Sequence, residues 1–192
     1  ISNTHPIIEK KSNIINLSFM NGDINNYIDL KKKLIQRKKF SFSDKKCTND
    51  LQPVPSLIFE NKYKINDILN GSYVIFNFNS KNPEKISIFK KGSQGLYYAI
   101  DEDSNLHIAS DVYGLINRSN KFKKLSADGT FIIDKKFIKN EKEKKFLKTD
   151  LMTNDLSKKG FERFFLKEIN DTEIFLKRTL NNYIDFNTST FT

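Results

Sequence analysis

The stretch "SFMNGDINNYIDLKKKL", Ser18–Leu34, places a carboxamide and a glycine, Asn21 and Gly22, where a predicted strand meets a predicted helix. An Asn-Gly pair is common in turns, because both residues tolerate backbone conformations that most others avoid. The same pair could also act on a substrate, since asparagine is polar and glycine lets another group approach the backbone closely. The residues by themselves leave both interpretations open.

Few other residues suggest chemistry. The two histidines, His5 and His107, and the single cysteine, Cys47, form no zinc-ligand pattern, so we expect no metal. The sequence contains no P-loop, no G-x-G-x-x-G and no G-x-S-x-G motif, and no organic cofactor is expected. His107 lies in a predicted strand, which favours a core or edge residue. Cys47 has only Lys45 and Lys46 nearby, and we assign it no nucleophilic role.

The net charge of +10, from 33 Lys+Arg against 23 Asp+Glu, raises the question of nucleic acid. Almost all of this positive charge is lysine, dispersed among acidic and amide residues. The four arginines do not cluster, although bidentate recognition of bases and phosphates favours arginine; they are Arg37, Arg118, Arg163 and Arg178. The pattern favours a solvated basic surface over a nucleic-acid-binding site.

The cysteine count and the hydropathy indicate a compartment. A single cysteine excludes an internal disulfide and is typical of a reducing environment, so we expect a cytoplasmic protein. No stretch approaches the roughly 20 apolar residues that span a bilayer. The N-terminal sequence "ISNTHPIIEKK" has neither a signal-peptide layout nor an initiator Met, so we expect the chain to begin inside a longer protein.

Apolar periodicity predicts a mixed domain of helices and antiparallel strands. We expect a strand over 13–20, a helix over 24–38, a short helix ending near residue 61, another ending before Asn70-Gly71, and a strand over 73–78. The segments "KISIFKKG", "GLYYAID" and "NLHIASD" predict a meander of three short strands. "KFKKLSADGTFIID" predicts a hairpin that turns at Asp128-Gly129. Residues 135–148 are typical of a surface excursion, and a helical pattern resumes after residue 160.

The order of several short motifs along the chain is more specific than any single motif. Along the chain run "NTHP", "NGDINNYIDLKKKL", "CTNDLQPVPSLI", "NGSYVIFNFNSKNPEKISIFKKGSQGLYYAI", "NLHIASDVYGLI" and "GFERFFLKEINDTEIFLKRTL". This succession resembles the glutaminase domain of glucosamine-6-phosphate synthase and its relatives, the class II (N-terminal nucleophile) glutamine amidotransferases. The corresponding family stretches are N-A-H-P, H-N-G-I-I-E-N-Y-x-x-L-K, S-E-T-D-T-E-V-I, R-G-A-Y, K-G-S-P-L-V-I-G-L, N-F-I-A-S-D and H-x-x-x-K-E-I.

The resemblance implies roles for three residues. Asn21 and Gly22 fall on the family's Asn-Gly, which forms the oxyanion hole for the glutamine amide. Asp50 falls on the aspartate of S-E-T-D-T-E, which binds the α-ammonium group of glutamine, although a carboxylate there is also a common helix cap. The sequence departs from the family where Met20 and Arg163 replace histidines and where Gln94 replaces the proline of G-S-P.

The resemblance also implies a fold and a domain organisation. The family fold is an α+β four-layer αββα sandwich with antiparallel sheets, and the family's nucleophilic cysteine and an R-W-A-T-H-G stretch lie upstream of N-x-H-P. We therefore expect residues 1–134 to be the later part of a glutaminase domain and a partial sandwich. Residues 135–160 would be a basic linker, and 161–192 a helical connector toward a sugar-phosphate isomerase domain. Expected partners are L-glutamine, a sugar phosphate, a missing N-terminal segment or partner chain, and further copies of the chain.

Two alternatives differ in class. The chain could be a catalytically degenerate glutaminase-like module with a regulatory or assembly role, which the presence or absence of an upstream Cys and Arg would distinguish. It could also be a basic module that binds nucleic acid or another acidic partner, for which a strongly salt-dependent affinity would be diagnostic.

Overall fold

A computed structural model describes residues 4–36, 48–61, 64–149, 157–181, 183–185 and 190–191. The chain divides into two compact units, Ile1–Asp150 and Leu151–Thr192. Cys47 and the last two residues of the helix predicted over 24–38 lie outside the described residues. In the described part, no helix is both long enough and apolar enough to cross a membrane.

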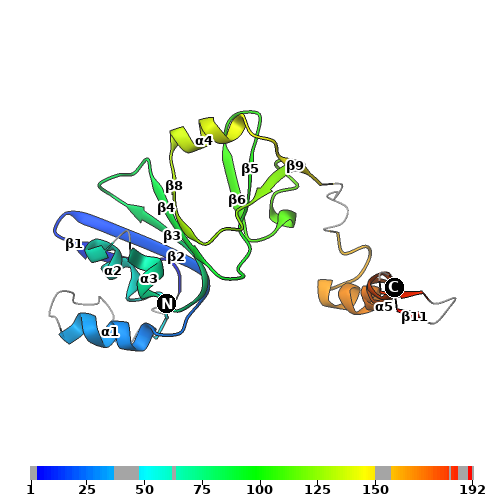
Figure 1. Ribbon diagram of the computed structural model, residues 1–192, viewed down its shortest axis with the longest axis horizontal. Coiled ribbons are helices and arrows are strands. Elements are labelled where there is room, and N and C mark those ends of the chain that lie inside the picture. The colour runs from blue at the N-terminus through cyan, green and yellow to red at the C-terminus, as the bar shows by residue number, and fades with distance from the viewer. Residues whose placement is uncertain are drawn as a thin grey trace. The chain divides into compact units, whose positions relative to one another are not determined.

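The first unit contains two antiparallel sheets (Figure 1). The five-stranded sheet has the order β1-β2-β3-β4-β8, built from β1 (Ile7–Lys11), β2 (Ile14–Ile24), β3 (Gly71–Asn79), β4 (Ile86–Lys91) and β8 (Gly129–Ile133). The four-stranded sheet has the order β6-β5-β7-β9, built from β5 (Tyr97–Ile100), β6 (Leu106–Ala109), β7 (Lys121–Lys124) and β9 (Leu147–Lys148). The remaining elements are α1 (Tyr27–Gln36), α2 (Val54–Asn61), α3 (Ile65–Ile68), a 3-10 turn (Val112–Gly114) and α4 (Lys135–Lys142).

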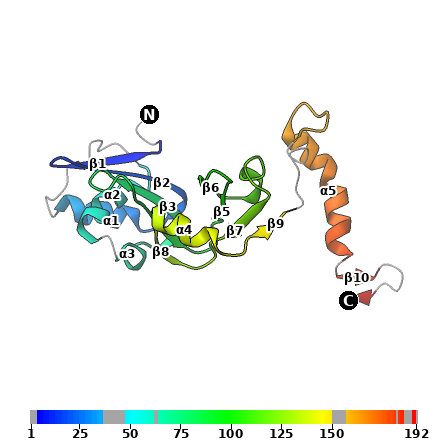
Figure 2. The ribbon, with the colours of Figure 1, turned by 90° about the horizontal axis from the view of Figure 1, so that it is seen from above.

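The central strand β3 is buried on both faces, which explains its nearly continuous apolar sequence. Successive side chains of a strand point to opposite faces. Tyr73 and Ile75 therefore join the core formed with the helices α1 to α3, which gather beside the five-stranded sheet (Figures 1 and 2). Val74 and Phe76 join a second core whose other members include Leu106 of β6. A helical layer thus covers one face of the large sheet, and the smaller sheet contributes to the core on the other.

Two strand pairings predicted from the sequence are wrong. The segment expected to form a hairpin around Asp128-Gly129 instead places β7 and β8 in different sheets. The expected meander is also interrupted, because β4 pairs with β3 and β8 whereas β5 pairs with β6 and β7. Turn residues specify that the chain reverses, but they do not specify which neighbour a strand will pair with. Here Leu125 contributes to the core shared by the two sheets, and the chain crosses between the sheets at that point.

Residues 135–148, predicted as a surface excursion, form α4 and β9 and carry a buried carboxylate. Glu141 accepts hydrogen bonds at its Oε2 atom from Tyr98 Oη, at 2.7 Å, and from Lys123 Nζ, at 2.8 Å. Its Oε1 atom accepts one from Lys144 Nζ at 2.5 Å. Burial by itself raises the pKa of Glu141, but these hydrogen bonds outweigh burial and lower the pKa to about 2.

The hydrogen bonds of Glu141 should make the stability of the fold depend on pH. The pKa of Glu141 in the folded protein lies below its unperturbed value of 4.5. Its contribution to the free energy of unfolding is therefore complete above pH 4.5 and is lost as the pH falls toward 2. Glu141→Gln should therefore lower the free energy of unfolding at pH 7 by roughly 3 kcal/mol. The difference from the wild type should shrink steadily below pH 4.5, as measured by urea denaturation at several pH values. The exposed neighbour Glu143→Gln is the control, and an equal loss in both variants would contradict the assignment.

The second unit contains one long helix, α5 (Phe164–Leu180), and a short antiparallel pair, β10 (Ile184–Asp185) with β11 (Thr190–Phe191). Large apolar side chains along α5 are exposed, and these are Phe164, Phe165, Leu166, Ile169, Ile174, Phe175 and Leu176. A helix with this much exposed apolar surface carries a face suited to contact with another element.

Candidate functional site

Asn21 and Gly22 lie inside a strand and not at a turn. The strand β2 continues through both residues to Ile24, and the helix α1 begins only at Tyr27. The predicted strand-to-helix turn at this pair is therefore wrong. Asn21 is exposed and lies opposite Val74 of β3 in the strand register, while Gly22 lies opposite Tyr73.

Two glycines allow the backbones of β2 and β3 to approach closely here. Gly22 has a φ of +122°, and a Cβ atom on it would lie 2.1 Å from the carbonyl oxygen of Ser72. Gly71 has a φ of +148°, and a Cβ atom on it would lie 2.1 Å from the carbonyl oxygen of Asp23. No side chain fits at either position, so the requirement for glycine is steric as well as conformational. This close approach fixes the backbone that directly follows Asn21, over residues 22–24.

The structure brings Asp50 to the same end of β2. One carboxylate oxygen of Asp50, Oδ2, accepts a hydrogen bond from the backbone N–H of Ile24 at 2.7 Å. The residue is half-buried, and among the described residues no donor is recorded for its other oxygen. A carboxylate held by one oxygen and open at the other can receive a cationic group.

The N-terminal "NTHP" motif also reaches this strand. The ring nitrogen Nδ1 of His5 accepts a hydrogen bond from the backbone N–H of Met20 at 3.3 Å. The side chain of Met20, which stands where the related family has histidine, packs against the core beneath the helices. Three motifs that are far apart in the sequence therefore meet around residues 20–24.

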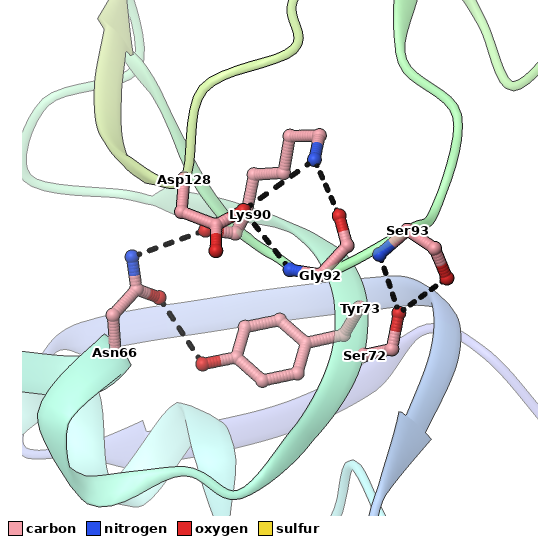
Figure 3. A network of polar contacts seen from close by, with 7 residues as sticks. All are labelled: Asn66, Ser72, Tyr73, Lys90, Gly92, Ser93 and Asp128. Atoms are coloured by element: carbon pink, nitrogen blue, oxygen red, sulfur yellow. Dashed lines mark hydrogen bonds and ion pairs between the residues drawn. The ribbon is translucent and has the colours of Figure 1, made fainter.

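A network of polar contacts continues the site along β3 (Figure 3). The hydroxyl of Ser72, which lies opposite Asp23 in the register, accepts a hydrogen bond from the backbone N–H of Ser93 at 3.0 Å. The backbone N–H of Gly92 donates to Asp128 Oδ1 at 2.9 Å, and the buried Lys90 donates to the carbonyl oxygen of Gly92 at 2.8 Å.

Sequence reasoning assigned no role to these residues. The signal was the "KKGSQG" stretch around Gly92, which matches the family's K-G-S-P motif but suggests a loop when read alone. Only the strand register shows that its serine lies beside the strand pair that carries Asn21 and Gly22.

Asn21 also lines an open apolar groove of about 390 Å³. The ring of Phe19 stacks on that of Phe76, with centroids 4.8 Å apart, and lies 6.0 Å from that of Phe78. Across the groove lie Leu106 and Ile108 of the smaller sheet. The groove therefore joins a polar amide at one point to a predominantly apolar floor. In the part of the chain that is described, no group of three or more His, Cys, Asp or Glu side chains could hold a metal ion.

Solved structures show which known fold the chain shares. Glutamine phosphoribosylpyrophosphate amidotransferase from Bacillus subtilis, complexed with ADP and GMP, matches with a TM-score of 0.51, over 69% of this chain and 32% of that chain. The allosteric regulatory enzyme of purine biosynthesis matches with a TM-score of 0.50, over 69% of this chain and 31% of that chain. Both are 14% identical to this chain in sequence. The chain thus has the fold of a glutamine amidotransferase, and the predicted α+β class with antiparallel sheets is confirmed.

Sequence comparison identifies the relatives more closely. Glutamine–fructose-6-phosphate aminotransferase (isomerizing) of Clostridium acetobutylicum is 30% identical over 95% of this chain. The corresponding enzyme of Clostridium perfringens is 29% identical over 95% of the chain. The chain is therefore a homologue of the glutamine–fructose-6-phosphate aminotransferases, as the resemblance suggested. It spans 31% of the length of each of these two relatives, and no protein-family model matches it.

The close approach at Gly22 yields a sharp prediction. Gly22→Ala should lower the free energy of unfolding by at least about 3 kcal/mol, because the new methyl group would collide with the backbone of β3. Thermal or urea denaturation measures the effect. Gly129→Ala is the matched control, since Gly129 also has a positive φ, of +153°, but its Cβ atom would meet nothing nearer than 3.6 Å. Equal destabilisation by both substitutions would show that φ, and not the strand contact, sets the requirement.

Proposed function

We propose that this chain is part of a glutamine-dependent amidotransferase of the glucosamine-6-phosphate synthase type, which hydrolyses glutamine and delivers ammonia to a sugar phosphate. The observation that carries the proposal is the convergence of Asn21, Gly22 and Asp50 on one end of β2. The homology to glutamine–fructose-6-phosphate aminotransferases over 95% of the chain supports it.

The proposed reaction uses a cysteine thiolate as nucleophile. Its sulfur attacks the carboxamide carbon of glutamine, and the electron pair of the C=O bond moves to oxygen. In this proposal the Asn21 side-chain N–H and the Gly22 backbone N–H donate hydrogen bonds to the resulting oxyanion. Collapse of the intermediate expels the nitrogen, which leaves as ammonia once it has taken up a proton. Water then attacks the thioester and releases glutamate and the thiolate.

Asp50 is proposed to hold the α-ammonium group of glutamine. Its Oδ2 atom is already anchored by the Ile24 N–H, so its side-chain orientation is set before the substrate arrives. Preorganisation of this kind lowers the entropic cost of binding. The second carboxylate oxygen then supplies the charge-assisted hydrogen bond to the substrate.

The nucleophile is proposed to come from a segment outside these residues, within the same protein or on a partner chain. Such a segment would occupy the apolar groove, because the groove passes Asn21 and its exposed Phe19 lacks a covering layer among the described residues. An apolar strand would cover the stacked phenylalanines and bring its cysteine to the amide. Cys47 is not proposed as a substitute.

The exposed apolar face of α5 is proposed as part of a connector toward a sugar-phosphate isomerase domain. We further propose that the enzyme works in the cytoplasm as a homo-oligomer. The single cysteine of the chain supports the reducing compartment. No metal or organic cofactor is needed for the proposed chemistry.

Intact mass and N-terminal sequencing of the protein isolated from its source would test the source of the nucleophile. An upstream segment or a co-purifying chain that begins with cysteine supports the glutaminase proposal. If neither accompanies the chain, it cannot perform this chemistry, and a regulatory or assembly role for a degenerate glutaminase-like module becomes the better explanation.

In the intact protein, Asn21→Ala should reduce the turnover number for glutamine hydrolysis by roughly 10²–10³, because one oxyanion donor is lost. The assay is glutamate release under saturating glutamine. The matched control is Asn140→Ala, which removes an exposed amide from α4 and should leave turnover unchanged. Unaltered turnover in the Asn21 variant would refute the oxyanion role.

Asp50→Asn should act mainly on substrate binding. The asparagine Oδ1 atom can still accept the bond from Ile24, so the local backbone should be preserved, but the charge that attracts the ammonium group is removed. We expect KM for glutamine to rise about tenfold or more, with a smaller change in kcat. A fall in the melting temperature without a change in KM would instead assign Asp50 a purely structural role.

A further inference from the structure

A second pocket lies away from Asn21, where β7, β9 and the end of α4 meet. It is an open hollow of about 550 Å³ lined by five lysines, two apolar residues and one aspartate, namely Lys121, Lys142, Lys144, Lys145, Lys148, Ile100, Phe146 and Asp101. Its volume falls in the range of small-molecule sites. The sequence predicted a dispersed basic surface and a basic linker over 135–160, whereas the fold gathers four lysines of that segment and Lys121 in one place.

Protein groups account for only part of this positive charge. Lys144 pairs with Glu141, and Lys142 donates to the neutral hydroxyl of Ser104. Lys142 also lies in the last turn of α4, where the helix dipole favours a cation. Among the described residues, no carboxylate is recorded within ion-pair distance of Lys121, Lys145 or Lys148.

Asp101 makes no ion pair with a lysine of the pocket among the described residues, and its oxygens are engaged by His107 and Asn105. Its Oδ2 atom contacts His107 Nε2 at 2.8 Å and accepts from Asn105 Nδ2 at 3.1 Å, while Oδ1 accepts from the Asn105 backbone N–H at 2.7 Å. The hydrogen bond with His107 is the main reason that the pKa of Asp101 falls to about 2. In the part of the chain that is described, Lys121, Lys145 and Lys148 thus have no ion-pair partner.

The register of one strand pair also places two of these lysines against each other. Lys121 of β7 lies directly opposite Lys148 of β9 in an antiparallel pair that has only two residue pairs. Like charges placed directly opposite each other across a pair destabilise it. The pair is nevertheless extended by a backbone hydrogen bond of 3.0 Å from Thr149 to Asn120. An anion bound between the two ammonium groups would remove the repulsion that this register imposes.

We propose that this pocket binds a small phosphate-bearing anion, such as a pyrophosphate or a phosphorylated metabolite. Lysine binds phosphate oxygens as a flexible point charge, and several lysines around one hollow favour a multiply charged group. Phe146 and Ile100 add an apolar wall for a non-phosphate part of the ligand. The limited volume of this hollow favours a small molecule over a nucleic acid, whose backbone requires an extended basic track. The proposal does not depend on glutamine chemistry at Asn21.

Isothermal titration of the full chain with inorganic pyrophosphate, at constant ionic strength maintained with chloride, tests this site. We expect saturable binding and a rise in melting temperature with pyrophosphate concentration. The double variant Lys121→Gln/Lys148→Gln should weaken binding about tenfold or more. It should not lower the melting temperature without ligand, because a like-charge pair is removed.

The matched control is Lys32→Gln/Lys33→Gln on α1, which changes the net charge equally but lies outside the pocket. It should alter the pyrophosphate affinity less than twofold. Equal weakening in both double variants would reduce the effect to net charge and overturn the proposal. Failure of pyrophosphate to bind while a single-stranded oligonucleotide binds here would also overturn it and favour nucleic acid. Unchanged glutamine hydrolysis in Lys121→Gln/Lys148→Gln would show that the lysine pocket and the site around Asn21 are functionally independent.

Discussion

The close contact between β2 and β3 at Gly22 and Gly71 is the constraint on which the rest of the first unit depends. Each glycine lies where a Cβ atom would meet a carbonyl oxygen of the opposite strand at 2.1 Å. Because both strands lack a side chain at these positions, β2 can continue as a strand through the Asn-Gly pair to Ile24. The continuous strand holds Asn21 on one face of the sheet and leaves the backbone N–H of Ile24 free to donate to Asp50.

The same strand pair contains a polar layer that would be costly if it were incomplete. Ser18 donates to Asn77 at 2.8 Å, Asn79 donates to Asn16 at 2.8 Å, and Asn16 donates to the carbonyl oxygen of Pro55 at 3.1 Å. Burying amides and hydroxyls is costly unless their hydrogen bonds are made. These bonds connect β2, β3 and the beginning of α2, so the segment that follows Asp50 is tied to the strand pair that carries Asn21.

The departures from the related family gain a physical meaning in this setting. Met20 replaces a histidine, and its side chain packs against the helical core while its backbone N–H contacts His5. The contact between the "NTHP" motif and the strand is thus made by the backbone and does not require a histidine at residue 20. The positive charge is also distributed unevenly, since lysines separated by up to 27 positions line one pocket where β7, β9 and the end of α4 meet.

The sequence by itself determined the class of the fold, most of the elements and the relationship to the glutamine–fructose-6-phosphate aminotransferases. Short apolar segments located β2 to β8 but not β1 or β9. The helical spacing over residues 24–38 located α1 to within three residues at its start, and the order of six weak motifs indicated the amidotransferase resemblance. Those signals are local, and local patterns set which residues of an element face a core.

Only the tertiary structure decided which strands pair and which distant residues meet. It separated β7 from β8, placed Asn21-Gly22 inside a strand, and brought Asp50 to Ile24 and Ser93 to Ser72. These outcomes depend on burial shared between two sheets and on backbone approach at two glycines. Neither quantity is encoded in the periodicity of any single segment, because both arise from contacts between residues far apart in the chain.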